Sequence, residues 1–295
     1  MIREWSSRPF ETCTSREQDL TFEYMSKMFE EAGLQLGNEQ MRSLGLVDDG
    51  LYTNLAYILS DQCQIGIRFA SYDDESKMII RGRHEFYGSV LKQFGDVMEY
   101  LNMYNPVTTT VDGTPKHKDV RPFPVVALRE AILNAIIHRD YSINGPILVS
   151  VFDDSIDIVS LGGLNKDLGP DDLILGVSSL RNPKLAGVFY RLHLVESYGT
   201  GIPKIMGCYD DSSFKPTIEL SSNAFKIKVP RVDNSNSDDE VSVMMLIKSN
   251  GEITRKDVED KLGISRAKAN QILLKLVDEK KIVKEGSARS TRYHL

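Results

Sequence analysis

Residues 125–139, VVALREAILNAIIHR, are apolar on almost every side of the helix that they predict. Such a helix must be covered all round, by a sheet or by further helices. Yet Glu130, Asn134 and His138 follow at intervals of four and share one face. Burying an unpaired polar group costs on the order of 2–7 kcal/mol in the least forgiving reference state. The three side chains are therefore either fully hydrogen-bonded or line a polar cavity, and their register favours the cavity.

The sequence around this helix mixes predicted strands and helices, which is typical of an α/β (α+β) protein. Its 295 residues provide enough chain for about two domains. The polar, acidic stretch RVDNSNSDDE at 231–240 predicts a linker. We expect an α/β segment at 1–117 packed on the next domain, a sheet-and-helix domain at 118–231, a linker at 232–240 and a small domain at 241–295.

The charge is distributed unevenly along the chain. The net charge is −6, but residues 240–295 hold twelve Lys and Arg against eight Asp and Glu, a net +4. The remainder therefore carries −10. An acidic body with a basic C-terminal region places any nucleic-acid contact at the C-terminus.

Membrane and export signals are missing from the sequence. No apolar run approaches the roughly 18 residues that span a bilayer. The N-terminal stretch MIREWSSRPFETC lacks the apolar core of a signal peptide. We expect a cytoplasmic protein without membrane contact.

Residues 241–295 predict a helix, a second helix capped by Thr254, a tight turn, a third helix and a hairpin. This order resembles a winged helix-turn-helix, which places one helix in the major groove of double-stranded DNA. Such domains usually read two half-sites as a homodimer, which we expect here. The candidate DNA contacts are Ser265, Arg266, Lys268, Asn270 and Gln271 on the helix, with Arg289 and Arg292 on the wing.

Two other interpretations of these basic residues stay open. They form a solvated surface, or the small domain binds a protein or dimerises. The concentration of positive charge in an otherwise acidic chain favours DNA.

Two common classes of ATP site are excluded by their missing motifs. The triplet HRD at 138–140 also occurs in protein kinases, but Asn144 follows Asp140 by four residues rather than five. The kinase glycine-rich loop, VAIK strand and DFG triplet are absent, and so is the Walker A motif GxxxxGK[ST]. A kinase and a P-loop helicase are both excluded.

The spacing E-x-x-x-N on a buried helix, followed by glycine-rich segments, resembles the GHKL (Bergerat-fold) ATP-binding domain. LREAILNAIIHRDYS, IDIVSLGGL, RNPKLAGVFYRL and VESYGTGIPKI occur in that order. Together they resemble bacterial and archaeal transcriptional regulators that join a Schlafen-type AlbA-like domain, this domain and a winged helix. Such proteins are often labelled RecG-related ATP-dependent DNA helicases, a label that the missing P-loop contradicts. The resemblance covers roughly residues 15–295 and implies a sandwich of helices on a mixed sheet.

The resemblance implies roles for two residues of the polar stripe. Asn134 would hold Mg²⁺ against the phosphates of ATP. Glu130 would orient or deprotonate the attacking water, which a position one turn from Asn134 allows. His138 stabilises the helix end rather than taking part in chemistry.

The resemblance also assigns the glycine-rich segments to the nucleotide, each with a structural alternative. Gly199, Thr200 and Gly201 would cradle phosphates with backbone N–H groups, or form a helix cap and turn. Gly162-Gly163 would shape the pocket, or simply end a strand. Arg181-Asn182 would form part of a lid within 164–200, or a surface turn before Pro183.

Two features depart from the family pattern. GHKL domains usually bind adenine through the Asp of a DxGxG box, whereas this chain has Ser160-Leu161-Gly162-Gly163, with Asp157 earlier on the strand. Only the tail of the AlbA-like domain is recognisable, which predicts a fragment or a truncated family member.

Three functions follow from these patterns. The first is a nucleotide-responsive, DNA-binding transcriptional regulator, which we expect. The second is a slow Mg²⁺-dependent ATPase in nucleic-acid processing or defence. The third is a scaffold with a degenerate nucleotide site, so the sequence leaves open whether the protein is an enzyme.

Overall fold

The computed structural model describes residues 8–110, 118–164, 169, 172, 177, 179–196, 199–210, 212–232, 235–286 and 291–295. The chain divides into a large unit, Met1–Val107 with Arg121–Val232, and a small unit, Thr108–Val120 with Asp233–Leu295. In chain order the large unit contains η1 (Phe10–Thr12), α1 (Glu23–Glu31), α2 (Asn38–Leu44), β1 (Val47–Asp48), β2 (Leu51–Tyr52), α3 (Asn54–Leu59), β3 (Ile67–Tyr72), β4 (Ile80–Phe86), α4 (Val90–Met103), α5 (Val125–Ile137), β7 (Ile147–Val151), β8 (Ser155–Leu161), α7 (Pro183–Arg191), α8 (Gly201–Gly207), β9 (Thr217–Leu220) and β10 (Ala224–Pro230). The small unit contains β5 (Thr108–Thr110), β6 (Lys118–Val120), α9 (Ser235–Asn250), β11 (Glu252–Ile253), α10 (Arg255–Leu262), α11 (Arg266–Asp278), β12 (Val283–Glu285) and β13 (Arg292–His294).

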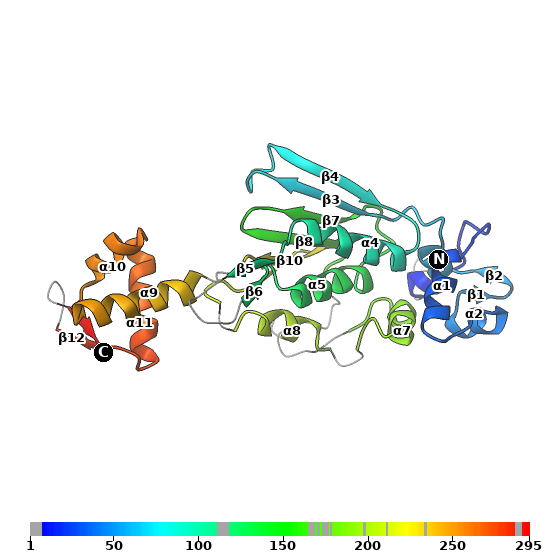
Figure 1. Cartoon of the computed structure of the whole chain (residues 1–295). Coiled ribbons are helices and arrows are strands. Elements are labelled where there is room, and N and C mark those ends of the chain that lie inside the picture. Colours follow the sequence, from blue (N-terminus) through cyan, green and yellow to red (C-terminus); the bar gives the residue numbers. More distant parts are fainter. Residues whose placement is uncertain are drawn as a thin grey trace. The chain divides into compact units, whose positions relative to one another are not determined.

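The centre of the large unit is a six-stranded sheet with the order β4-β3-β7-β8-β10-β9 (Figure 1). β3 and β7 are parallel, and the other neighbours are antiparallel. β7 and β8 form a hairpin, in which Val149 pairs with Ile158 across the turn at Asp153-Asp154. The protein therefore has the mixed α+β fold that the sequence predicted.

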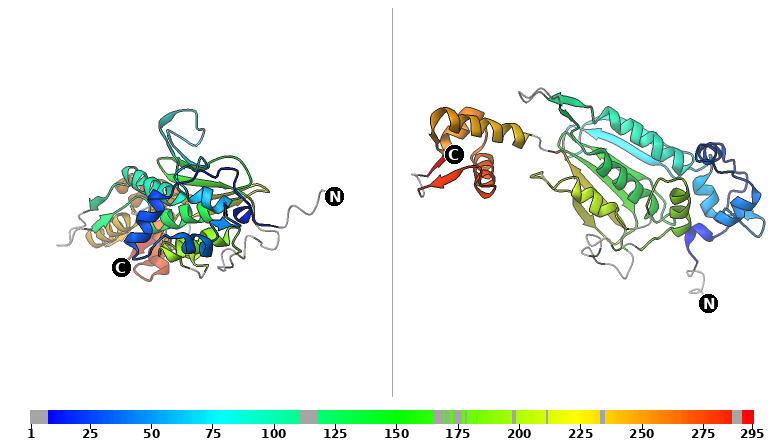
Figure 2. Two further views of the ribbon diagram at one scale, coloured as in Figure 1. Left: turned by 90° about the vertical axis from the view of Figure 1, so that its right-hand side faces the viewer. Right: turned by 60° about the horizontal axis from the view of Figure 1, so that its bottom comes forward.

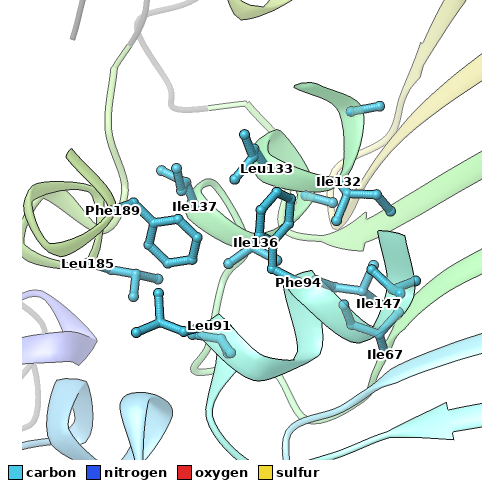
Figure 3. Packing of buried hydrophobic residues seen from close by; sticks show 14 of the residues in the cluster. Ile67, Leu91, Phe94, Ile132, Leu133, Ile136, Ile137, Ile147, Leu185 and Phe189 are labelled. Atoms are coloured by element: carbon cyan, nitrogen blue, oxygen red, sulfur yellow. The ribbon is translucent and has the colours of Figure 1, made fainter. Parts of the chain in front are cut away.

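Helices α4, α5 and α8 lie on one face of this sheet, as the views in Figures 1 and 2 agree. α5 is apolar on nearly all sides because α4, α8, β8 and β10 all pack against it. Figure 3 shows Ile132 and Ile136 of α5 among Phe94 of α4 and Ile67 and Ile147 of the sheet. Burying one such side chain contributes about 1.5–3 kcal/mol, so α5 is the centre of the core.

The N-terminal segment shares this core. Met25, Phe29 and Leu55 belong to the same buried cluster as Ile136 of α5 and Ile227 of β10. Glu11 of η1 is fully buried, and its carboxylate accepts hydrogen bonds from the backbone N–H groups at the start of α7. Residues 8–107 therefore support the helices that surround α5.

The small unit has its own core between three helices and a three-stranded sheet of order β11-β13-β12. Thr254 caps α10 as the sequence predicted, in a reciprocal capping box with Asp257. Ser265 caps α11 by accepting a hydrogen bond from the Lys268 N–H. The hairpin of β5 and β6 groups with this unit rather than with the segment 1–117.

The segment 232–240, expected to be a linker, is largely helical, because α9 begins at Ser235. Acidic side chains near a helix N-terminus interact favourably with the helix dipole. Asp239 and Glu240 also form ion pairs with Lys268 and Lys275 of α11. The polar composition of 235–240 therefore predicted a linker where the chain forms about one and a half further turns of helix. Among the described residues, no helix is long and apolar enough to cross a membrane.

Candidate functional site

The polar stripe of α5 borders a cavity of about 360 Å³ in the large unit. Glu130, Asn134 and His138, the C-cap of α5, all line it, although most residues of this helix are buried. The size lies within the range of small-molecule sites. The polar residues and glycines that line the cavity are Glu130, Asn134, His138, Gly162, Gly163, Ser179, Arg181, Gly187, Tyr190, Glu196, Gly199, Thr200, Gly201 and Lys204.

Glu130 and Asn134 are fixed in place at one end of this cavity. The Asn134 amide donates a 2.8 Å hydrogen bond from Nδ2 to the Glu130 carbonyl, which leaves Oδ1 to serve as an acceptor or ligand. Arg129 holds the Glu130 carboxylate at 2.9 Å. A β-carbon at Gly201 would lie 2.9 Å from Asn134 Nδ2 and 3.4 Å from Glu130 Oε2. α8 approaches α5 this closely only because residue 201 is glycine.

A lysine and a second carboxylate complete this end, and the sequence patterns missed both. Lys204 Nζ lies 2.7 Å from Glu196 Oε2, and Thr200 donates to the same carboxylate at 3.4 Å. The hydrogen bond from Lys204 is the main reason why the pKa of Glu196 is below its usual value. The sequence did contain one signal for Lys204. It follows Thr200 by one helical turn, so both side chains lie on the same face of the helix.

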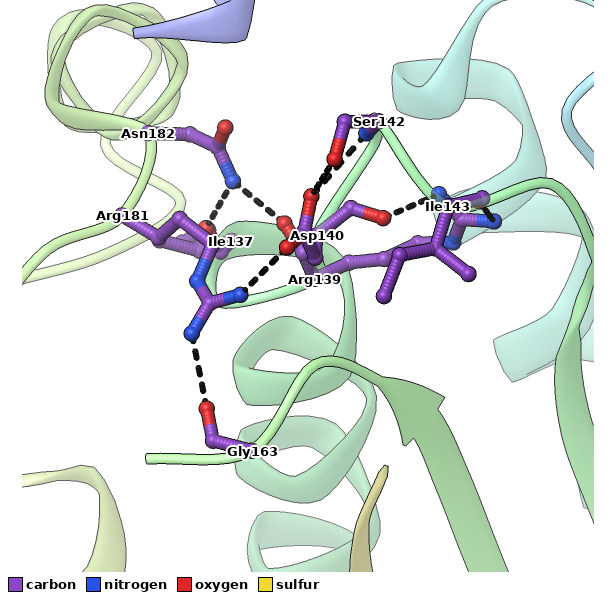
Figure 4. Close-up of polar contacts among 8 residues, drawn as sticks. All are labelled: Ile137, Arg139, Asp140, Ser142, Ile143, Gly163, Arg181 and Asn182. Atoms are coloured by element: carbon purple, nitrogen blue, oxygen red, sulfur yellow. Dashed lines mark hydrogen bonds and ion pairs between the residues drawn. The ribbon is translucent and has the colours of Figure 1, made fainter. Parts of the chain in front are cut away.

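The turn after β8 is held against the end of α5 by Arg181 (Figure 4). Its guanidinium donates to Asp140 Oδ2 at 2.8 Å and to the Gly163 carbonyl at 2.7 Å. Gly162 adopts φ +106°, and a β-carbon at Gly163 would lie 2.6 Å from the Ser222 carbonyl. Both positions therefore require glycine for the turn itself, while the turn also borders the cavity.

Asn182 was expected to bind the ligand, but it does not line the cavity. Its side chain is 2% exposed and donates 2.8 Å hydrogen bonds to the carbonyls of Ile137 and Arg139. These carbonyls lie at the end of α5, where the helix offers them no N–H partner. Asn182 therefore joins α7 to α5, as Figure 4 shows.

His138 lies at the other end of the stripe and lines the cavity beside Arg181. Burial, with a smaller effect from the Arg181 guanidinium, lowers the pKa of His138 to about 4. A hydrogen bond to the Ser179 backbone opposes this shift. The imidazole is therefore neutral at physiological pH.

Asp157, the acidic residue nearest to the glycine turn on β8, does not line the cavity. It pairs with Lys226 at 3.1 Å, and Lys226 also pairs with Glu219. Its neighbours in the strand, Ile156 and Ile158, belong to the helix-covered core, so Asp157 faces the opposite side of the sheet.

The candidate DNA contacts lie on one helix and one strand of the small unit. Arg266 and Gln271 are exposed on α11, and Asn270 is half-buried. Lys268 pairs with Asp239 at 2.9 Å, and Arg292 of β13 pairs with Glu252. Arg289 lies outside the described residues. Two of the expected cations therefore already have acidic partners within the unit.

Three comparisons with known proteins bear on this architecture. Residues 144–229 match a family model described as "Putative ATP-dependent DNA helicase recG C-terminal", an ATPase-like domain. The match includes the glycine turns but begins after α5. No curated protein matches the sequence. The crystal structure of the DIP2311 protein from Corynebacterium diphtheriae is similar in fold, with a TM-score of 0.66 and 21% identity over 99% of this chain. This chain spans 65% of the length of that protein. Within this chain, residues 144–229 resemble an ATPase-like family.

Proposed function

We propose that the chain is a nucleotide-responsive, DNA-binding transcriptional regulator. Its large unit would bind ATP with Mg²⁺ in the manner of a GHKL (Bergerat-type) domain, and its small unit would bind DNA as a winged helix-turn-helix. The observation that carries the proposal is the cavity, which gathers Glu130, Asn134, the glycine turn at 162–163, Arg181 and residues 199–201 around one space.

The residues of the cavity suit a polyphosphate. Lys204 and Arg181 supply positive charge, and residues 199–201 supply backbone N–H groups. A β-carbon at Gly187, which also lines the cavity, would meet nothing within 4 Å, so the space beside it is open. A polyphosphate would compete with Glu196 for Lys204, since both are anions.

The same residues suit Mg²⁺ only together with phosphate. Among the described residues, no group of three or more His, Cys, Asp or Glu could hold a metal ion by itself. Mg²⁺ prefers oxygen ligands and commonly takes one or two from the protein and the rest from phosphates and water. Asn134 Oδ1 is the protein ligand that we propose. The bound ion would neutralise phosphate charge.

Replacing Asn134 by alanine tests this assignment. We expect Asn134→Ala to weaken ATP binding in the presence of Mg²⁺ by about 10- to 100-fold, as removal of groups at metal sites commonly does. Without Mg²⁺, the variant and the wild type should bind ATP within about threefold of each other. Isothermal titration calorimetry measures both. Equal Mg²⁺ dependence in the two proteins would remove Asn134 from the metal site.

A slow ATPase is the second candidate, because the Glu130 carboxylate lines the cavity one turn from Asn134. A carboxylate in hydrogen-bond reach of a water is able to act as a general base. In the same titrations, Glu130→Ala separates the candidates. Nucleotide binding without turnover in either protein favours the regulator, and turnover that Glu130→Ala abolishes favours the enzyme. If neither nucleotide nor Mg²⁺ binds, the scaffold remains.

The proposed DNA-binding surface is the exposed side of α11 together with the hairpin of β12 and β13. The order of helices and the three-stranded sheet support it, as does the net positive charge of residues 240–295. Pairing of two chains as a homodimer would place two such helices on two half-sites. ATP would change DNA binding only if it binds two arrangements of the protein with different affinity. Part of the 164–200 segment, expected to act as a lid, lies outside the described residues.

A further inference from the structure

The cavity is chemically different at its two ends. Its lining contains two carboxylates among the described residues, Glu130 and Glu196. Glu130 adjoins Asn134 and Gly201, and Glu196 is bound to Lys204 of α8. No carboxylate of the described lining lies at the His138 end, and Asp157 faces the other side of the sheet. Among the described residues, a ligand that fills the cavity therefore meets His138 rather than a carboxylate at this end, since the nearby Asp140 carboxylate is bonded to Arg181 and does not line the cavity.

His138 lies at a useful distance from the phosphate end. It follows Asn134 by four residues and Glu130 by eight on the same helix, which corresponds to about 6 and 12 Å along the helix axis. A nucleotide whose phosphates lie at Asn134 and Lys204 and whose base extends along α5 would reach His138. Ile137 and Leu180 line the cavity beside it and supply apolar contact for a base.

The backbone around His138 is held firmly. Asn182 bonds the carbonyls of both adjacent residues, Ile137 and Arg139, each at 2.8 Å. The Asp140 N–H donates to the Leu161 carbonyl at 2.7 Å. The backbone that carries the ring is therefore held in place, which a group that selects a ligand requires.

The hydrogen bonding of the ring fixes its role. A neutral imidazole has one N–H donor and one acceptor nitrogen. The hydrogen bond to the Ser179 backbone raises the pKa of His138, so the ring is its donor, and burial keeps the ring neutral. The second ring nitrogen is therefore an acceptor on a side chain that lines the cavity.

We propose that His138 selects adenine, because its acceptor nitrogen receives a hydrogen bond from the exocyclic amino group of the base. This inference rests on the proposed nucleotide site and assigns to a histidine the recognition for which the described lining of the cavity has no carboxylate at this end. Adenine carries an amino donor at position 6, whereas guanine carries a carbonyl acceptor there. Guanine would bring two acceptors together and leave both unpaired, which costs more than losing one hydrogen bond.

A cycle with two proteins and two ligands tests the inference. The proteins are the wild-type chain and His138→Ala, and the ligands are ATP and purine riboside triphosphate, which lacks the 6-amino group. We expect removal of the amino group to weaken binding to the wild type about tenfold, and to His138→Ala less than twofold. GTP should bind the wild type at least about tenfold more weakly than ATP.

Three controls keep the result interpretable. Inorganic tripolyphosphate should bind both proteins equally, because it has no base. His138→Gln, which retains an acceptor, should restore part of the preference for ATP. Thermal unfolding of each variant checks its fold, and if the variants fail to fold, equal binding of ATP, purine riboside triphosphate and GTP to the wild type still overturns the inference.

The possible failures are distinguishable. If the two proteins lose the same affinity on removal of the amino group, or the wild type binds ATP and GTP equally, His138 does not select the base and the nucleotide site stands. If the wild type binds neither ATP nor tripolyphosphate, the proposed function itself falls and the inference falls with it.

Discussion

Gly201→Val is expected to weaken ATP binding by up to about 150-fold while the protein stays folded. The added β-carbon would lie 2.9 Å from Asn134 Nδ2, which is already bonded to the Glu130 carbonyl. The side chain of Asn134 must then move, or α8 must move away from α5. Forcing additional atoms into a packed site costs roughly 1–3 kcal/mol, and the upper value corresponds to about 150-fold in affinity. Calorimetric titration with ATP and Mg²⁺ measures the loss.

Gly207→Val is the matched control for this substitution. Gly207 lies at the other end of the same helix, and a β-carbon there would meet nothing within 4 Å. Both variants add the same side chain to α8, so a loss confined to Gly201→Val reports on the cavity. Equal affinities for the two variants would mean that ATP does not use the space between α8 and Asn134.

The second large effect concerns DNA. A chain that ends at Val232 is expected to lose detectable binding to duplex DNA and to keep its ATP affinity. The buried cluster of the large unit contains no residue of α9–α11, so the shortened chain retains its own core. The truncation removes residues 240–295, which carry a net positive charge. Fluorescence anisotropy with a labelled duplex at several salt concentrations measures the binding, which should weaken steeply with salt in the full chain.

A pair of single substitutions localises that surface. Arg266→Ala removes an exposed cation from the start of α11, and Lys248→Ala removes one from the end of α9. We expect about tenfold weaker DNA binding for the first and less than twofold for the second. Unchanged DNA binding by the chain that ends at Val232 would rule out the winged-helix assignment.

Local patterns were enough to predict the elements that build the site. The apolar circumference of α5 predicted its burial, and the spacing of Glu130, Asn134 and His138 placed them on one face. The Thr254 cap was predicted because a capping box is a contact between residues three positions apart. Such features depend only on residues that are close together in the sequence, so one sequence is enough to predict them.

Contacts between distant segments were not predictable in the same way. Asn182 has an amide side chain of a kind that often binds ligands. Here it donates a hydrogen bond to a carbonyl at the end of α5, 45 residues away in the sequence. Glu196 and Lys204 enter the cavity only because α8 packs on α5. The acidic start of α9 is helical because it meets the lysines of α11. Each case depends on tertiary packing, which overrides local composition.

The central claim, that ATP with Mg²⁺ occupies this cavity, is tested most directly by amide hydrogen exchange of the full chain with and without the nucleotide. We predict that MgATP slows exchange in residues 130–138, 161–163 and 199–204, which line or adjoin the cavity. No slowing in these three segments, or slowing confined to residues 235–295, would contradict it.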